Sequence, residues 1–263
     1  MVVRMARQIV DGDVVVQGLA TPLVAAAYLL ARQTHAPNLY FASAIGQGIC
    51  SQPAQLGLTN VEKLWLDRSL VTVGFVRTAL EMLPRLNPKE FFRPAQVDAQ
   101  GNFNNIAFGR DYRRPRLRLP GTGGIPDVTT YFDNIYLYVP RHSRVTFALK
   151  LDFKSGLGHD PGRRHGKGPC LLISDLGEFD FAYGRMRLIS YHPGISYEKI
   201  QANTGFPLDI SPHLKETPPP TEEELRLLRE EIDPLGIRRL ETLNGSERRQ
   251  LLAKIIAREK PIL

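Results

Sequence analysis

The sequence has few features of a secreted or membrane protein. It contains two cysteines in 263 residues, and Cys50 and Cys170 lie too far apart to form the disulfide framework of small secreted domains. We expect both to be free thiols in a reducing cytoplasm. The longest apolar run, Leu19–Ala31, contains Thr21 and Pro22 and is too short to span a bilayer. We therefore expect no membrane anchor.

The chain also lacks the motifs of several ligand classes. Its net charge of +7 and pI near 9.5 suit an anionic partner, but no basic cluster with a nucleic-acid reading motif is present. His159 and His165 flank Asp160 at a spacing that matches no zinc pattern. No serine or cysteine lies in a nucleophile elbow. We expect no nucleic acid, no metal and no permanently bound cofactor.

Short apolar runs rich in β-branched and aromatic residues predict strands. They cover Val14–Val16, Tyr40–Ser43, Ser69–Val73, Ile135–Tyr138, Arg144–Leu149, Cys170–Ser174 and Met186–Tyr191. Between the first two, Pro22–Thr34 has strong helix formers and begins with a proline. This strand–helix–strand unit predicts an α/β fold, with an open, largely parallel sheet and covering helices.

Further helices are predicted at Val76–Leu83, which should end before Pro84, and at Tyr197–Asn203. Three consecutive prolines from Pro218 form a stiff connector before a helical tail. Thr221 and Glu224 form a capping box that should begin a helix through Ile232, and Ser246–Arg258 should form another. We therefore divide the chain into a domain of residues 1–215 and a helical extension, 216–263, that docks on the body or on a partner.

The segment "AQVDAQGNFN" gathers amides, an acid and a glycine in one turn after Pro94. From chemistry alone, a self-hydrogen-bonded turn explains it. The segment also resembles the QVD-x-x-GN signature of CoA-transferase β subunits. Further segments resemble the family in the same order along residues 8 to 235. They begin with "GDVVVQGLATPLVAAAYLLARQTHAPNL" and include "GTGGIPDVTT", "SDLGEFDF", "SYHPGIS", "NTGFPLDIS" and "LREEIDP". The resemblance implies an open α/β fold and an acyl-CoA site shared with an α subunit, commonly as two copies of each.

Two glycine-rich segments are candidate binding loops. In the resembled family a loop like Gly121, Gly123 and Gly124 lines the thioester site, although such a cluster can be only a turn. The resemblance also places Gly46 and Gln96 among the binding residues. Arg163, Arg164 and Lys167 follow several glycines, and their cations could hold the phosphates of coenzyme A. The alternative for this basic segment is a solvated loop.

Transferases of this family pass the acyl group through a glutamyl–CoA thioester, which requires a carboxylate nucleophile. When "HAPNLYFASAIG" is matched to the glutaconate-type β subunit, Ala44 occupies the nucleophile's position. The first glutamate of the chain is Glu62, so no gap adjustment supplies one here. This chain therefore has no identified catalytic residue, and the resemblance implies that any carboxylate comes from the α partner.

The segments "SDLGEFDF", "HPG" and "PTEEELRLLREEIDP" look more like the IpdAB-type enzymes, family relatives that hydrolyse a carbon–carbon bond in a ring of steroid-derived CoA thioesters. The resemblance implies that this chain is the β subunit of such an enzyme, with coenzyme A as part of the substrate. Two alternatives stay open. One is a true CoA-transferase of the glutaconate or 3-oxoacid type, and the other is a non-catalytic acyl-CoA-binding subunit.

Overall fold

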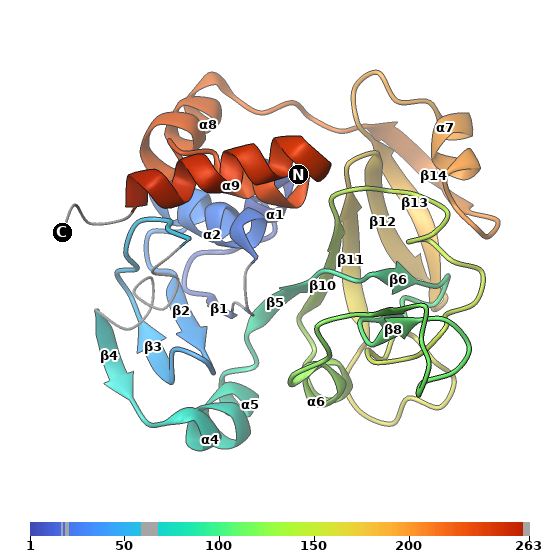
Figure 1. Ribbon diagram of the computed structural model, residues 1–263, viewed down its shortest axis with the longest axis horizontal. Coiled ribbons are helices and arrows are strands. Elements are labelled where there is room, and N and C mark those ends of the chain that lie inside the picture. The colour runs from blue at the N-terminus through green and yellow to red at the C-terminus, as the bar shows by residue number, and fades with distance from the viewer. Residues whose placement is uncertain (17, 19–20, 59–67, 260–263) are drawn as a thin grey trace. The chain divides into compact units, whose positions relative to one another are not determined.

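The computed structural model describes residues 1–16, 18, 21–58 and 68–259. The chain forms two compact units, one of Met1–Glu90 with Pro220–Leu263 and one of Phe91–Pro219 (Figure 1). We call them unit 1 and unit 2. This division differs from the predicted boundary after residue 215, because the C-terminal segment joins the first 90 residues in one compact unit.

The sheet of unit 1 has the strand order β5-β1-β2-β3-β4. Its strands are β1 (Val14–Val16), β2 (Tyr40–Ser43), β3 (Gly48–Cys50), β4 (Ser69–Thr72) and β5 (Lys89–Phe92). The central strand β1 pairs in parallel with β2 and β5, whereas β2, β3 and β4 form an antiparallel meander. The carboxyl ends of β5, β1 and β2 therefore lie at the same edge of the sheet.

Helix α2 (Pro22–Thr34) joins β1 to β2, and its bounds are those predicted. Residues Leu23–Ala31 are buried, since the helix packs between the sheet and α1 (Val2–Ala6). The Tyr28 hydroxyl donates to the Val16 carbonyl at 2.9 Å, and its ring meets Phe41 edge to face. These contacts satisfy the only polar atom of a large buried side chain and fix the helix against β1 and β2.

The C-terminal helices pack on the same unit. They are α8 (Glu222–Arg226), η2 (Leu227–Ile232), η3 (Ile237–Glu241) and α9 (Gly245–Glu259). Of these, η2 and η3 pack against α2, and α9 packs against η3. The capping box of Thr221 and Glu224 is present, and Arg7 binds Glu224 through two hydrogen bonds. The Glu241 carboxylate accepts a 2.8 Å hydrogen bond from Leu23 N at the start of α2. The tail is thus docked on the body of its own chain.

The helical segment after β4 is longer than predicted. It runs through α4 (Phe75–Arg77), η1 (Thr78–Met82) and α5 (Leu83–Leu86). The predicted end before Pro84 is wrong. The π-helical turn η1 is followed directly by a new α-helix, α5, and Pro84 lies in the first turn of α5. A missing N–H is tolerated in a first turn, whereas it would break the middle of an α-helix.

Unit 2 contains a sheet of order β14-β13-β12-β11-β10. Its strands are β10 (Ile135–Val139), β11 (Pro169–Ser174), β12 (Gly177–Ala182), β13 (Arg185–Tyr191) and β14 (Asp209–Glu216). The pairs β10–β11 and β13–β14 are parallel, and the hairpins through β12 are antiparallel. Two small ribbons, β6 (Gln96–Val97) with β7 (Phe103–Asn104) and β8 (Ala107–Phe108) with β9 (Leu117–Arg118), precede them. The short helices are α6 (Ile125–Tyr131) and α7 (Tyr197–Ala202).

The predicted strand Arg144–Leu149 is wrong. The amides of Thr146 and Phe147 bond the Ser143 carbonyl in a turn, and Phe147 contributes only an isolated bridge to Val97. The apolar residues are there because Phe147 is fully buried and stacks on His142 with ring centroids 3.5 Å apart. The α/β class, the open sheet with parallel pairing and covering helices, and the helical tail are confirmed.

Candidate functional site

Ala44 opens the turn between β2 and β3, at the carboxyl edge of the parallel strands. The Ser43 hydroxyl accepts a 2.9 Å hydrogen bond from Gly46 N, and Gln47 N bonds the Ala44 carbonyl. Gln47 has φ 58°, so the turn closes through a left-handed residue. Ala44 is half-buried and Gly46 is buried. The structure thus places a methyl group in this turn, at the residue that the family resemblance matches with the nucleophile, and that match stays a prediction. Glu62 lies outside the described residues.

A carboxyl group that the sequence reasoning missed lies beside this edge. Glu90 on β5 is only 6% exposed, and it pairs in register with Val16, as Ala42 does from the other side of β1. The three residues therefore form one row on one face of the sheet. Burial raises the pKa of the Glu90 carboxyl to about 8. No hydrogen bond or ion pair to this carboxyl is found within residues 1–58 and 68–259, apart from positions 17, 19 and 20.

A second buried polar group without a hydrogen-bond partner in the described part of unit 1 is the hydroxyl of Thr21, the N-cap residue of α2. Its hydroxyl oxygen is buried and has no hydrogen-bond partner in the described structure. The helix start itself is occupied, because the Glu241 carboxylate binds Leu23 N. The N-terminal end of α2 therefore carries the Glu241 carboxyl group, which suits the positive end of a helix dipole. The Thr21 hydroxyl beside it has no hydrogen-bond partner among the described residues.

The QVD segment of unit 2 forms a self-hydrogen-bonded turn. Asp98 accepts hydrogen bonds from Gln100 N, Asn102 N and the Asn102 amide at 2.9–3.0 Å. Burial raises the pKa of Asp98, although these hydrogen bonds and Lys154 oppose the shift. Gly101 has φ 75° and a Cβ there would lie 2.7 Å from the Phe181 ring, so the turn requires glycine. The structural reading of this motif is correct.

Gln96 precedes that turn and is also held internally. Its side chain is buried, and its Oε1 accepts from Asn104 Nδ2 at 2.7 Å and from Asp152 N at 3.1 Å. These two hydrogen bonds connect the β6–β7 ribbon to the segment before residues 155–168, the glycine-rich stretch that we call the basic loop. Binding of substrate by Gln96 stays a prediction.

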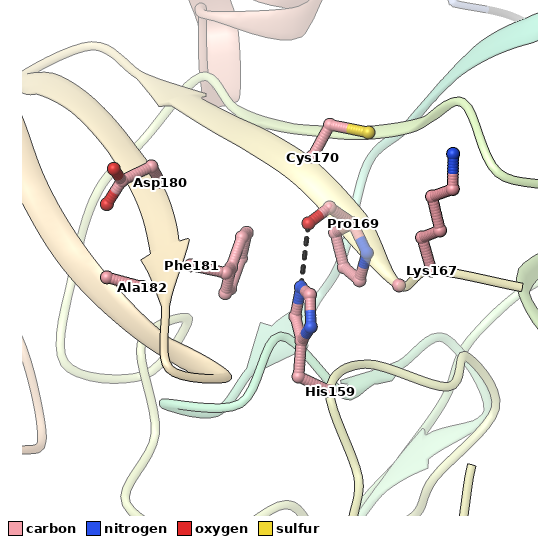
Figure 2. A pocket seen from close by; sticks show the side chains of 8 residues that line it. His159, Lys167, Pro169, Cys170, Asp180, Phe181 and Ala182 are labelled. Atoms are coloured by element: carbon pink, nitrogen blue, oxygen red, sulfur yellow. Dashed lines mark hydrogen bonds between the residues drawn. The ribbon is translucent and has the colours of Figure 1, made fainter.

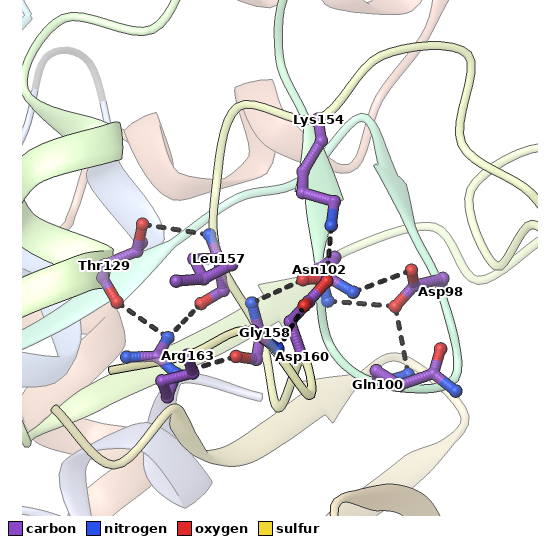
Figure 3. A network of polar contacts seen from close by, with 10 residues as sticks. Asp98, Gln100, Asn102, Thr129, Lys154, Leu157, Gly158, Asp160 and Arg163 are labelled. Atoms are coloured by element: carbon purple, nitrogen blue, oxygen red, sulfur yellow. Dashed lines mark hydrogen bonds and ion pairs between the residues drawn. The ribbon is translucent and has the colours of Figure 1, made fainter. Parts of the chain in front are cut away.

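Arg163 binds its own chain through every donor of its guanidinium. Figure 3 shows the bonds to Thr129, Leu157 and Gly158. The five N–H groups donate to main-chain carbonyls of the loop and of α6, namely those of Thr129, Thr130, Leu157, Gly158 and His165. The Asn102 side chain, which bonds Asp98, also accepts from Gly158 N at 2.8 Å. The QVD turn, the basic loop and α6 thus form one polar network, which argues for a structural role of Arg163 in place of phosphate binding.

Arg164 and Lys167 are exposed, whereas Arg163 is half-buried. Lys167 lines a shallow pocket of ≈ 290 Å³ together with His159, Cys170, Asp180 and Phe181 (Figure 2). His159 closes one side, since its Nε2 lies 2.9 Å from the Pro169 carbonyl oxygen and its ring stacks on Phe181. A cation at the rim of an open pocket can reach an anion in solution. Phosphate binding by Arg164 and Lys167 stays a prediction.

The glycine segment of unit 2 forms an open loop that leads directly into α6. Gly121 and Gly123 have φ of 112° and 51°, and neither meets another atom within 4 Å of an added Cβ. Gly124 is the N-cap of α6, so a helix follows the glycine cluster at once. The loop requires glycine for its backbone conformation, and the open space beside it leaves room for a ligand. Its role in thioester binding stays a prediction.

Two features are absent from the part of the chain that the structure describes. There, no three His, Cys, Asp or Glu side chains gather in a way that could hold a metal. Over the same residues, no helix has both the length and the apolar character needed to cross a bilayer.

Comparison with protein families gives the context of these sites. The coenzyme A transferase family matches residues 1–203. The chain is 33% identical over 251 residues to the B subunit of glutaconate CoA-transferase from Acidaminococcus fermentans, covering 88% of this chain and 90% of the relative. It is 32% identical over 254 residues to the B subunit of 3-oxoadipate CoA-transferase from Pseudomonas knackmussii (87% and 90%), and 30% identical over 221 residues to the cholesterol ring-cleaving hydrolase IpdB subunit of Mycobacterium tuberculosis (80% and 83%).

Solved structures agree with the sequence relatives. The decarboxylase AibA/AibB superposes with a TM-score of 0.77 at 32% identity, covering 90% of this chain and 94% of that one. Glutaconate CoA-transferase of A. fermentans gives a TM-score of 0.79 at 27% identity, covering 93% and 96%. These relatives are enzymes of three reaction types on one fold. With its open α/β sheet and the QVD turn in the family's order, the chain belongs to the coenzyme A transferase family and is a homologue of its B subunits.

Proposed function

We propose that this chain is the β subunit of a two-subunit enzyme that acts on acyl-CoA thioesters without forming a glutamyl thioester on this chain. The observation that carries the proposal is the methyl group of Ala44 at the position where the resembled transferases have their nucleophile. Alanine can act neither as a nucleophile nor as a base, and covalent transfer through this position is chemically impossible.

The reaction that fits best is hydrolytic carbon–carbon cleavage of the IpdAB kind, with the catalytic glutamate supplied by the α subunit. Two of the relatives support chemistry other than transfer, since one is a subunit of a ring-cleaving hydrolase and another is a decarboxylase. Coenzyme A is then part of the substrate, and no permanent cofactor is required. Arg164 and Lys167, which are exposed, are proposed to bind its phosphates.

A true CoA-transferase is the second candidate. The chain is 33% and 32% identical to two transferase relatives and 30% identical to the hydrolase relative. This similarity favours the transferase as the second candidate. The transferred acyl group would then need a carboxylate from another place in the complex. A non-catalytic acyl-CoA-binding subunit is the remaining alternative.

The α subunit is proposed to cover an apolar surface of unit 1 on β4 and the helical segment that follows. Five large apolar side chains are exposed there, namely Leu70, Val71, Phe75, Val76 and Leu80. Such clustering marks an interaction site, since scattered exposed apolar residues would need no explanation. We propose an assembly of two α and two β subunits in the cytoplasm.

Charged substitutions on this surface should prevent assembly. Val76→Glu with Leu80→Glu places two acids where 64% and 71% of the side chains are exposed, so the isolated chain should fold normally while co-purification with the α subunit is lost. The control is Tyr183→Glu, a fully exposed residue of unit 2 outside the surface. Normal assembly of the double variant would show that the α partner docks elsewhere.

The proposed function is tested by assaying the isolated chain and the reconstituted complex. Each is given acyl-CoA substrates with a cleavable ring or side-chain carbonyl, and, separately, an acyl-CoA with a free carboxylic acid acceptor. We expect no turnover by the isolated chain and C–C cleavage without CoA exchange by the complex. CoA exchange by the complex would establish the transferase, and turnover by the chain alone would refute the need for a partner.

A further inference from the structure

Glu90 lies on the same face of the sheet as Ala42, two residues before the alanine that the family resemblance matches with the nucleophile. Ala42 and Glu90 both pair with Val16, so they are two strand spacings apart, or about 10 Å. Ala44 follows Ala42 by two residues, or about 7 Å further toward the carboxyl edge. The Glu90 side chain leans the same way, because its Oε1 lies 4.0 Å from where a Cβ of Gly18 would be. Gly18 follows the end of β1 and is exposed.

A purely structural role does not account for this carboxyl. Burying an acid without a hydrogen-bond partner destabilises the folded state, and a leucine would avoid that cost. The neighbouring charges do not compensate, since Lys89 on the opposite face binds Asp13 at 2.6 Å and the Gln8 carbonyl at 2.8 Å. Within the described residues, Glu90 is therefore a buried acid with no internal partner.

Thr21 supplies a second, independent observation at the same end of β1. Its buried hydroxyl also lacks a partner among the described residues, and it lies on the segment that leads from β1 into α2. Buried polar groups are almost always satisfied, and exceptions are found where a ligand, water or partner completes the bonding. Two such exceptions flanking one strand end indicate that something polar binds there.

We propose that Glu90 is a proton-donating acid of the acyl-CoA site, and that it protonates the carbanion left when a carbon–carbon bond of the substrate breaks. The proposal rests on the proposed function. It also narrows the substrate to acyl-CoA thioesters with a carbonyl or carboxylate group β to the thioester, because only these leave an electron pair that the thioester can stabilise as an enolate.

The proton balance of this step is complete. Water adds to the substrate ketone after losing a proton to a base, the C–C bond breaks, and its electron pair forms the enolate. The Glu90 carboxyl proton passes to the enolate carbon, and the proton taken from water restores the carboxyl through solvent. Decarboxylation would need the same proton, because loss of CO2 leaves the same enolate. A buried acid that stays protonated near neutral pH suits this task.

The test uses the reconstituted complex with Glu90→Gln and the matched control Glu230→Gln, an exposed acid of the same unit that lies in η2, outside the proposed α-subunit surface. Glutamine keeps the size and a hydrogen-bond donor but cannot transfer a proton. We expect kcat to fall roughly 10²- to 10⁴-fold with KM within a few fold, and the decline of kcat above pH about 8 to disappear. Glu230→Gln should match the natural complex.

The outcomes separate this proposal from the function on which it rests. A natural complex without C–C cleavage activity would overturn the proposed function, and the role of Glu90 with it. An active natural complex whose Glu90→Gln variant keeps kcat and the alkaline decline would overturn only the role of Glu90. A variant that fails to assemble is resolved by Glu90→Asp, which keeps the acid and should retain part of the activity with the alkaline decline still present.

Discussion

Replacing Glu90 by glutamine should raise the free energy of unfolding at alkaline pH and remove the contribution of this carboxyl to its pH dependence. Below pH about 6.5 the buried His142, whose pKa burial lowers to about 3, contributes in the opposite direction. In the folded chain, burial raises the pKa of Glu90 from 4.5 to about 8. Between these values the folded state binds one proton more than the unfolded state, so stability falls as pH rises. The full loss, reached above pH 8, is on the order of 3–5 kcal/mol, from a 1.4 kcal/mol contribution per pKa unit.

This effect is measured by urea unfolding of the isolated chain at about pH 5, 7 and 9. The natural chain and Glu230→Gln should change in stability across this range by the same amount, whereas Glu90→Gln should gain stability relative to both as pH rises. Glutamine is neutral at every pH and keeps the shape of the protonated acid. Parallel curves for all three proteins would show that Glu90 ionises normally in the folded chain.

Replacing Arg163 by alanine should destabilise unit 2 by about 2–4 kcal/mol. The change removes five hydrogen bonds from a cation and leaves the carbonyls that accept them, in the basic loop and in α6, without a donor. Solvent reaches part of this network, since Arg163 is half-buried, and this limits the effect. Arg163→Lys should recover little, because one ammonium group cannot reach five diverging carbonyls.

Arg164→Ala is the matched control in the same loop. Arg164 is exposed, and its removal should change stability by less than about 0.5 kcal/mol. If its cation meets a coenzyme A phosphate in the complex, affinity for CoA should fall by about 1–3 kcal/mol, and Lys167→Ala should act in the same direction. Thermal unfolding and titration calorimetry separate the two effects. Equal stability of both arginine variants would contradict the structural role of Arg163.

Local patterns in the sequence predicted local structure well. The proline at the start of α2, its apolar composition and the Thr221–Glu224 capping box determine helix ends through interactions within a few residues. The QVD turn likewise closes through bonds from Asp98 to Gln100 and Asn102. Such elements need no knowledge of distant parts of the chain.

Contacts between distant segments could not be predicted in this way. Phe147 belongs to an apolar run, but it is buried by stacking on His142 and takes no strand position. Glu241 reaches Leu23 over 218 residues, which is why the tail belongs to unit 1. Arg163 looked like a free cation because main-chain carbonyls leave no signal in a sequence. Glu90 could have been noticed as a lone acid within the apolar segment "KEFF".

The absence of a nucleophile at Ala44 is the central claim, and trapping of a covalent intermediate tests it most directly. The reconstituted complex is incubated with acyl-CoA and treated with borohydride or hydroxylamine, which react with a glutamyl–CoA thioester and leave free carboxylates unchanged. Peptide mass spectrometry then reads every Asp and Glu of this chain, including Glu62 and Glu90. We predict that all of them are unmodified. A modified carboxylate at any position of this chain would contradict the account and establish covalent transfer.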